Sequence, residues 1–436
     1  MKVLVKGLLG AVALAGFSLP AYADTTLTIA TVNNGDMITM QKLTDDFTKA
    51  NPDIKVNWVT LEENDLRQKV TKDISTKGGQ FDILTIGTYE TPIWGKKGWL
   101  IPLTSIDNVD DLLPPIRAGL SVGDKLYASP FYGESSFTMY RKDLFDKAGL
   151  KMPDAPSWDF VADAARKLTD RKTGLNGICL RGKAGWGENM AFIDSLANSL
   201  GASWFDEKWN PQFDTPEWKK TLTFYLDLMK DAGPEGASGN GFSENLALFQ
   251  SGKCAMWIDA TSAGAHVADS HEAPMVADKV GFALAPDAGL GKRANWLWSW
   301  ALGIPAGTKN ADAAQKFINW ATSKHYLEYV AAQKGWVAVP PGTRTSLYAN
   351  PEYQKAAPFA KATIDSINAA DPNHPTVKPV PYTGVQFVAI PEFQGLGTKV
   401  GELFSNALAG QMKADAALTE AQAYVKTQMT KAGYIK

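Results

Sequence analysis

Three tryptophans at alternating positions stand out in the sequence. Trp296, Trp298 and Trp300 share one parity, so on a β-strand their indole rings point to the same face. Such a face is either part of the hydrophobic core or an open surface on which the C–H groups of a ligand can stack. Because Trp300 leads into the apolar segment ALGIP, we expect Trp300 in the core and Trp296 and Trp298 at a binding cleft.

Two charged residues follow apolar, strand-like segments. Asp259 ends the segment CAMWID, and Arg181 ends GICLR. Charged groups that follow buried strands lie where a doubly wound sheet binds its ligands. The two side chains are therefore candidates for pairing with ligand hydroxyls, or for pairing with each other as a structural ion pair.

Further polar residues follow the two clearest strands of the N-terminal region. Asn33, Asn34 and Asp36 come after the alternating segment 25–32, and Tyr89 comes after the apolar run 81–86. Such positions suit ligand contacts, although Asn and Asp also favour turns for local reasons.

Two more candidates stand beside segments of mixed character. Glu134 precedes the expected strand 137–141, where a carboxylate can accept hydrogen bonds from two hydroxyls; the alternative is a solvated glutamate. Trp186 lies in the segment GKAGWGEN, whose small and polar residues bury it poorly. Either a ligand or an opposing part of the protein must cover its indole.

Catalytic and metal-binding motifs are missing from the sequence. It contains no G-x-S-x-G, H-E-x-x-H or P-loop motif, and its histidines are scattered. We predict no metal and no cofactor, and no catalytic residue is assigned.

Alternating strands and helices of regular length carry these residues. The segments 25–32, 54–58 and 81–86 read as strands, with helical spacing of apolar residues between them. Helices are expected at 189–199, 216–230, 244–250, 313–322 and 393–409, and strands at 254–259, 280–284 and 298–304. This order predicts an α/β protein with doubly wound sheets.

The N-terminus predicts export. Lys2 and Lys6, an apolar run over 7–19 and the sequence AYA before Asp24 describe a signal peptide spanning residues 1–23. The apolar run is shorter than the ~20 residues of a spanning helix. Removing these residues changes the net charge from 44 − 46 = −2 to 42 − 46 = −4. Without a basic cluster, nucleic acid is not an expected partner.

The sequence contains two cysteines, Cys179 and Cys254. Export to an oxidising compartment permits a disulfide between them, whereas their apolar surroundings are equally typical of small buried thiols.

Segments spread over almost the whole mature chain resemble the family 1 extracellular solute-binding proteins of ABC importers, which share the fold of maltose-binding protein. The matching segments are LTIATVNNGD, FTKANPDIKVNWV, GGQFDILTIG, GWLIPL, YASPFYGESSFTMYRKDLFDKAGL, PSWDF, FQSGKCAMWIDA and GIPAGTKNADAAQKFINWATS. Within this family, NWLWSW and NNGD look most like members that bind sorbitol, mannitol and related polyols.

The resemblance implies a two-lobed periplasmic-binding-protein fold of type II, each lobe a doubly wound sheet flanked by helices, with the ligand cleft between the lobes. It implies a first lobe of residues 24–133 and 302–338 and a second lobe of 134–301 and 339–436, with hinges near Gly133 and Ala301. By the same resemblance, Glu134, Trp186, the residues after the first strand, Tyr382 and Gln394 contact or approach the ligand.

The resemblance further implies a periplasmic, monomeric binding protein that is not an enzyme. It would capture a sugar alcohol of the sorbitol or mannitol type, or a small sugar, and deliver it to the membrane permease of an ABC importer. The alternatives are a secreted glycoside hydrolase, with Glu134 and Asp259 as its carboxylate pair, and a lectin-like adhesin, which the absence of repeats disfavours.

Overall fold

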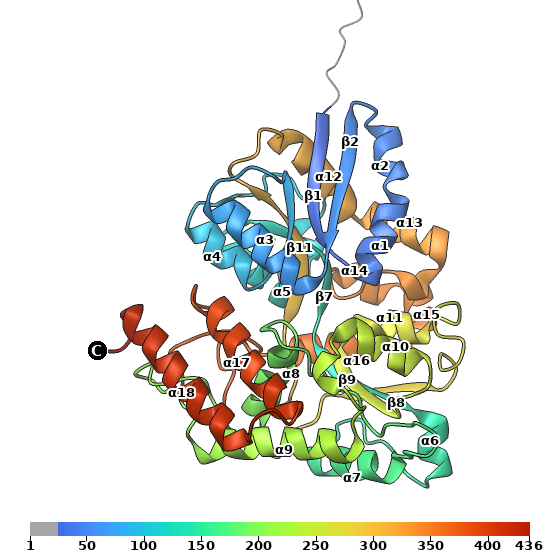
Figure 1. The fold of residues 1–436 in the computed structure, drawn as a ribbon. Helices are drawn as coiled ribbons and strands as arrows, with labels where there is room; N and C mark the ends of the chain where they lie inside the picture. Colours follow the sequence, from blue (N-terminus) through green and yellow to red (C-terminus); the bar gives the residue numbers. More distant parts are fainter. Residues whose placement is uncertain (1–24) are drawn as a thin grey trace, which may run out of the picture.

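The computed structural model describes residues 25–436, so the predicted signal peptide at 1–23 lies outside the described residues. Figure 1 shows two lobes, one above the other, with strands β7 and β11 running between them. Within the described residues, the helices are all too short or too polar to cross a membrane.

The first lobe is built on a mixed sheet whose strand order is β2-β1-β3-β11-β4, with β7 also paired to β11. β1 is parallel to β2 and β3, and β11 is antiparallel to β3, β4 and β7. The interior strands β1, β3 and β11 are largely buried because helices cover both faces of the sheet. The strands are β1 (Thr25–Val32), β2 (Ile54–Leu61), β3 (Ile83–Gly87), β4 (Leu100–Ile101), β7 (Ala128–Glu134) and β11 (Trp298–Pro305).

Helices flank this sheet as the alternating pattern predicts. In Figure 1, α3 and α4 lie on one side of the sheet, and α1, α2 and α12 lie on the other. The first-lobe helices are α1 (Gly35–Leu43), α2 (Asp45–Ala50), α3 (Glu63–Ser75), α4 (Glu90–Lys96), α5 (Pro114–Gly119), α12 (Ala311–Ala321) and α13 (Lys324–Lys334); a short hairpin joins β5 (Ser121–Val122) and β6 (Lys125–Leu126).

The second sheet differs in detail from the expected doubly wound sheet. Its three strands, in the order β10-β8-β9, are antiparallel: β8 (Ser136–Arg141), β9 (Met256–Ala260) and β10 (Val280–Leu284). The parallel component is the segment 176–180, which runs beside β9 through bridges at Asn176 and Cys179. β8 follows the crossing strand β7 after one residue.

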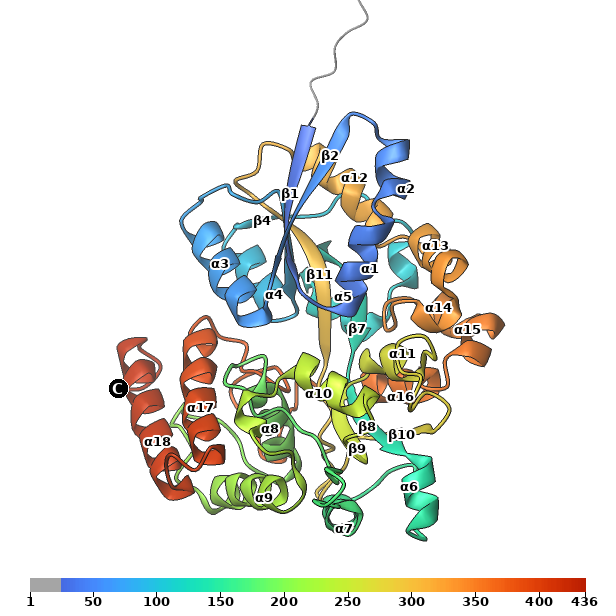
Figure 2. The ribbon, with the colours of Figure 1, turned by 45° about the vertical axis from the view of Figure 1, so that its right-hand side comes forward.

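Helices make up most of the second lobe. α8, α9, α17 and α18 pack on one another at one end, and α16 packs on β8 and β10. In Figure 2, α14 and α15 lie beside the junction of the lobes. The helices are α6 (Lys142–Lys147), α7 (Trp158–Leu168), α8 (Asn189–Ser199), α9 (Pro216–Ala232), α10 (Phe242–Gln250), α11 (Ala263–Ala268), α14 (Thr345–Ala349), α15 (Pro351–Ala356), α16 (Ala360–Ala369), α17 (Phe393–Leu408) and α18 (Ala414–Lys431).

The crossing strands pack tightly at the junction of the lobes. β7 and β11 pair from Ala128 to Glu134, with a register shift between Trp300 and Ala301. Gly133 donates its N–H to Pro341 O at 2.9 Å, and a Cβ on Gly133 would lie only 2.2 Å from Gly342 O. Glycine is therefore needed here for a close backbone approach.

Cys179 and Cys254 form a disulfide, with their Cα atoms 5.9 Å apart. The bond ties the segment 176–180 to the strand region that begins β9. The sequence left open whether the two cysteines are bridged or are free thiols, and the structure contains the disulfide.

Candidate functional site

A cavity of about 170 Å³ lies between the two lobes. This volume exceeds the ~10–15 Å³ that one water needs, so the cavity has room for a molecule of several heavy atoms. It is lined mainly by Val32, Asn33, Asn34, Glu62, Glu63, Arg67, Tyr132, Glu134, Arg181, Lys183, Trp186, Gly187, Glu188, Ala191, Phe242, Ser243, Glu244, Ala260, Ser262, Trp296, Trp298, Trp300 and Gln386.

Four indoles form much of the apolar part of the cavity wall. Trp296, Trp298 and Trp300 come from β11 and the residues before it, and Trp186 comes from the loop before α8. The Trp186 and Trp298 rings are 5.8 Å apart, and the Trp298 and Trp300 rings are 5.4 Å apart. Trp300 is buried in the core as expected, at 4% exposure, and it also lines the cavity because the shared parity continues along β11.

The Arg67 guanidinium lies over three of these indoles. Its guanidinium carbon lies 4.0 Å from the ring centroid of Trp186, 4.9 Å from that of Trp298 and 4.6 Å from that of Trp300. Arg67 comes from the first lobe and Trp186 from the second, so this cation–π contact joins the lobes.

Two glutamates hold the Arg67 guanidinium in place. Glu63 Oε1 accepts from Nη2 at 2.9 Å, and Glu90 Oε1 accepts from Nη1 at 2.6 Å. Glu90 is in turn fixed by the N–H of Gly87, 2.9 Å from its Oε2. The two glutamates and the indole contacts together fix the orientation of the arginine side chain.

Glu134 lines the cavity at the end of β7, as expected for a ligand contact. Its Oε2 accepts a hydrogen bond from Ser262 Oγ at 2.6 Å. Burial raises the pKa of Glu134 to about 8, against the opposing effects of the Ser262 hydroxyl and the Arg181 charge. This carboxyl group can therefore exchange a proton near neutral pH.

Arg181 and Asp259 form the ion pair that the sequence left as an alternative. Arg181 Nη2 lies 2.7 Å from Asp259 Oδ1, and Arg181 Nε lies 2.9 Å from Oδ2. Asp259 also accepts from Trp257 Nε1 at 3.1 Å and from the N–H of Ala260 at 2.7 Å. Arg181 lines the cavity, whereas Asp259 is fully buried behind it.

Of the three predicted residues after β1, two line the cavity and one does not. Asn34 lines the cavity and caps α1: its Oδ1 accepts from Met37 N at 3.0 Å, and its Nδ2 donates to Tyr132 Oη at 3.0 Å. Asn33 also lines the cavity. Asp36 is buried away from it, with Oδ2 4.0 Å from His266 Nε2, and burial raises its pKa to about 6.

Three other predicted residues lie outside the cavity lining and act in packing. The Tyr89 hydroxyl donates to Ile390 O at 2.9 Å, and its ring supports Trp186 at a centroid distance of 4.8 Å. Tyr382 Oη accepts from Trp204 N at 3.1 Å, and Gln394 Oε1 accepts from Thr71 Oγ1 at 3.1 Å. Tyr382 and Gln394 therefore form hydrogen bonds that support neighbouring segments of the protein and do not face the cavity.

Several lining residues were missed from the sequence. Arg67 and Glu63 stand on an amphipathic helix among other charged residues, and nothing local separates them from solvated neighbours. Gln386 fixes the Trp-rich segment, since its Nε2 donates to Leu297 O at 2.9 Å. Glu188 follows Trp186 in GKAGWGEN, so its proximity to a predicted contact was an available signal.

The family model for bacterial extracellular solute-binding proteins matches residues 33–328. The chain belongs to this family. It is 56% identical over 435 residues to a mannitol-binding protein of Pseudomonas aeruginosa, an alignment that covers 99% of each chain. The predicted family is thereby confirmed.

Solved structures give the same assignment. The solute-binding protein of an ABC transporter from Agrobacterium vitis S4, crystallised with bound D-mannitol, is 69% identical, with a TM-score of 0.93 over 94% of this chain and 100% of that one. Maltose-bound MalE3 of T. maritima is 22% identical, with a TM-score of 0.79 over 93% of this chain and all of that one, and it supports the fold alone. The two-lobed α/β architecture predicted from the sequence is confirmed.

Proposed function

We propose that this solute-binding protein captures a hexitol, D-mannitol first of all, in the interlobe cavity and delivers it to the permease of an ABC importer. The observation that carries the proposal is the 69% identity to a chain that holds D-mannitol, combined with the indole- and carboxylate-lined cavity between the lobes.

The cavity chemistry suits a neutral molecule with many hydroxyl groups. The C–H surface of the carbon chain can pack on Trp186, Trp296 and Trp298, which bury large areas with few rotatable bonds. Hydroxyls need both donors and acceptors once water is displaced, because an unpaired buried polar group costs ~1–3 kcal/mol. Glu134 supplies an acceptor, and the Arg67 guanidinium supplies donors.

Lobe closure would couple binding to delivery. Contacts already join the lobes: Lys183 Nζ lies 2.5 Å from Glu62 Oε1, and Asn64 Nδ2 donates to Ala184 O at 3.2 Å. A ligand that touches both lobes stabilises the closed form, and a shift from 1:99 to 99:1 requires ~5.5 kcal/mol of differential affinity. We propose as the moving bodies the two lobes predicted from the sequence, residues 24–133 with 302–338 and residues 134–301 with 339–436.

The proposed setting is the periplasm, reached through the signal peptide at 1–23, and the protein would act there as a monomer. Catalysis is not part of the proposal. Asp259 could serve as one of a glycosidase's carboxylate pair only if it faced the substrate, but its oxygens accept from Arg181, Trp257 and Ala260 and it is fully buried.

Isothermal titration of the purified mature protein with D-mannitol, D-sorbitol, ribitol, D-mannose and maltose tests the proposal. We expect the tightest binding to a hexitol, and a ligand at 100 times its dissociation constant should add ~2.7 kcal/mol of stability. The same samples are assayed for reducing ends after incubation with oligosaccharides. Absence of hexitol binding, or release of new reducing ends, would refute the proposal.

A further inference from the structure

Glu188 is a buried carboxylate without a hydrogen bond. It lines the cavity just before α8, and the residue is 4% exposed. Within residues 25–436, no donor lies within hydrogen-bonding geometry of its oxygens, and Oε2 is also sealed from solvent. Buried polar groups without a partner are rare in native proteins, and each needs an explanation.

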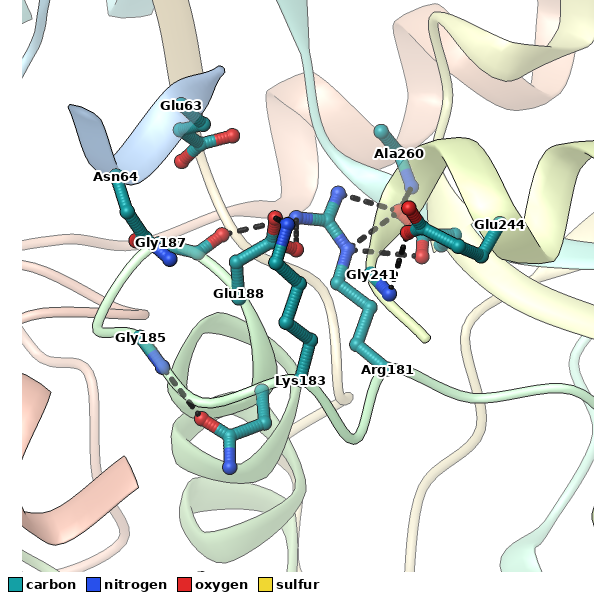
Figure 3. Close-up of polar contacts among 12 residues, drawn as sticks. Glu63, Asn64, Arg181, Lys183, Gly185, Gly187, Glu188, Gly241, Glu244 and Ala260 are labelled. Atoms are coloured by element: carbon teal, nitrogen blue, oxygen red, sulfur yellow. Dashed lines mark hydrogen bonds and ion pairs between the residues drawn. The ribbon is translucent and has the colours of Figure 1, made fainter. Parts of the chain in front are cut away.

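The two cations near Glu188 are held by other groups. Arg181 Nη1 lies 3.5 Å from Glu188 Oε2, but this guanidinium is hydrogen-bonded to Asp259 and to Gly187 O. Lys183 Nζ lies 3.9 Å from Glu188 Oε1, but it is bound to Glu62 at 2.5 Å. Figure 3 shows the Glu188 carboxylate beside the Arg181 and Lys183 side chains.

The backbone beside Glu188 is also unable to donate. A Cβ on Gly241 would lie 2.6 Å from Glu188 Oε2, so the carboxylate is packed against the start of α10. The N–H of Gly241 is already bonded to Glu244 Oε2 at 2.9 Å. Neither of the two cations nor the Gly241 N–H makes a hydrogen bond to the carboxylate in this arrangement. Oε2 is sealed, so Oε1 is the oxygen that a ligand in the cavity can reach.

We propose that Glu188 is a specificity-determining ligand contact, whose carboxylate accepts a hydrogen bond from a hydroxyl of the bound polyol. This inference rests on the proposed function. A ligand hydroxyl satisfies the buried acceptor without disturbing Arg181 or Lys183. A ligand that lacks the hydroxyl at this position leaves the carboxylate unpaired and binds less well.

The test measures dissociation constants by titration calorimetry at pH 8.5 for wild type, Glu188→Gln and Glu188→Asp. The ligands are D-mannitol and its 1-deoxy, 2-deoxy and 3-deoxy analogues. Glu235→Gln, which removes an exposed carboxylate outside the cavity lining, is the matched control. We expect Glu188→Gln to weaken D-mannitol binding about 10- to 100-fold, the range for a hydrogen bond to a charged group.

A double-mutant cycle that combines the Glu188→Gln change with removal of one ligand hydroxyl distinguishes a direct ligand contact from a structural role of Glu188. If Glu188 accepts from one hydroxyl, wild type and Glu188→Gln should bind one deoxy analogue with similar affinity, because both lack the same hydrogen bond. Binding of D-mannitol by Glu188→Gln within twofold of wild type would overturn the inference. Equal losses for all four ligands would also overturn it, since they indicate a structural role.

Two readouts keep this inference apart from the proposed function. Wild type that binds no hexitol refutes the function itself, whereas wild type that binds while the Glu188 variants match it refutes only the role of Glu188. If Glu188→Gln does not fold, Glu188→Asp decides: its shorter side chain retracts the carboxylate, so the same cycle should show a loss confined to one hydroxyl.

Discussion

Replacing Arg67 with methionine is expected to lower the free energy of unfolding by about 3–5 kcal/mol, the range for breaking a buried ion pair from one side. The magnitude follows from burial: the Arg67 and Glu90 side chains are only 5% and 3% exposed, and their closest atoms are 2.6 Å apart. Without the guanidinium, Glu90 keeps one hydrogen bond, from Gly87 N, and its charge is left uncompensated. Methionine still packs on the indoles, so lost apolar contact is a minor part of the effect.

The double variant Arg67→Met/Glu90→Gln isolates the cause. Glutamine can still accept from Gly87 N but carries no charge, so we expect the double variant to recover at least half of the stability lost in Arg67→Met. The control is Arg166→Met, which removes an arginine that is 43% exposed and pairs with Asp231 at 2.9 Å. An exposed pair of this kind contributes about 0–1 kcal/mol.

Urea unfolding followed by circular dichroism measures these differences, and calorimetry with D-mannitol measures the effect on closure. Because Arg67 packs on Trp186 across the lobes, the same variant should also bind the ligand more weakly. An Arg67→Met protein within 1 kcal/mol of wild type, or a double variant no more stable than the single one, would refute the reasoning.

Three further predictions concern protons and the disulfide. Burial raises the pKa values of Glu134 and Glu188 to about 8, and hydrogen bonds from ligand hydroxyls favour the ionised carboxylates. The dissociation constant for D-mannitol should therefore fall severalfold from pH 6.5 to 8.5. Titration calorimetry that finds no change over this range would contradict the prediction. Burial raises the pKa of Asp36 from 3.8 to about 6, so the stability linked to its protonated form is lost as the pH rises through 6. Asp36→Asn should therefore be more stable than wild type by ~1–3 kcal/mol at pH 7.5 but not at pH 4, and equal differences in thermal unfolding at both values would contradict it. Replacing Cys179 and Cys254 with serine opens a link of sequence separation 75 and should cost ~4 kcal/mol in urea unfolding; a loss below 1 kcal/mol would contradict it.

Much of the local structure was predictable because it depends on short-range patterns. The helix expected at 189–199 has those bounds in the structure, and the strand expected at 280–284 is β10. The end of β7 places Glu134 at the cavity, and the parity along β11 places Trp298 there. These positions follow from strand ends and side-chain alternation, which the sequence carries directly.

It was harder to predict whether a polar side chain faces the cavity or pairs with a residue from a distant segment. Arg181 and Asp259 both follow strands, but their mutual ion pair withdraws Asp259 behind the cavity wall. Tyr89 follows β3 as expected, yet its hydroxyl is taken by Ile390 O. Each outcome depends on a partner more than 70 residues away.

The sequence by itself determined the family, the order of helices and strands, and the supply of indoles and carboxylates near the strand ends, because periodicity and local motifs fix backbone conformation. Only the tertiary structure decided that Arg67 lies against Trp186 and that Trp300 joins the cavity wall. Only it left Glu188 without a donor, because that depends on how neighbouring cations pair across two lobes. Packing between distant segments, and not local propensity, assigns each polar group its partner.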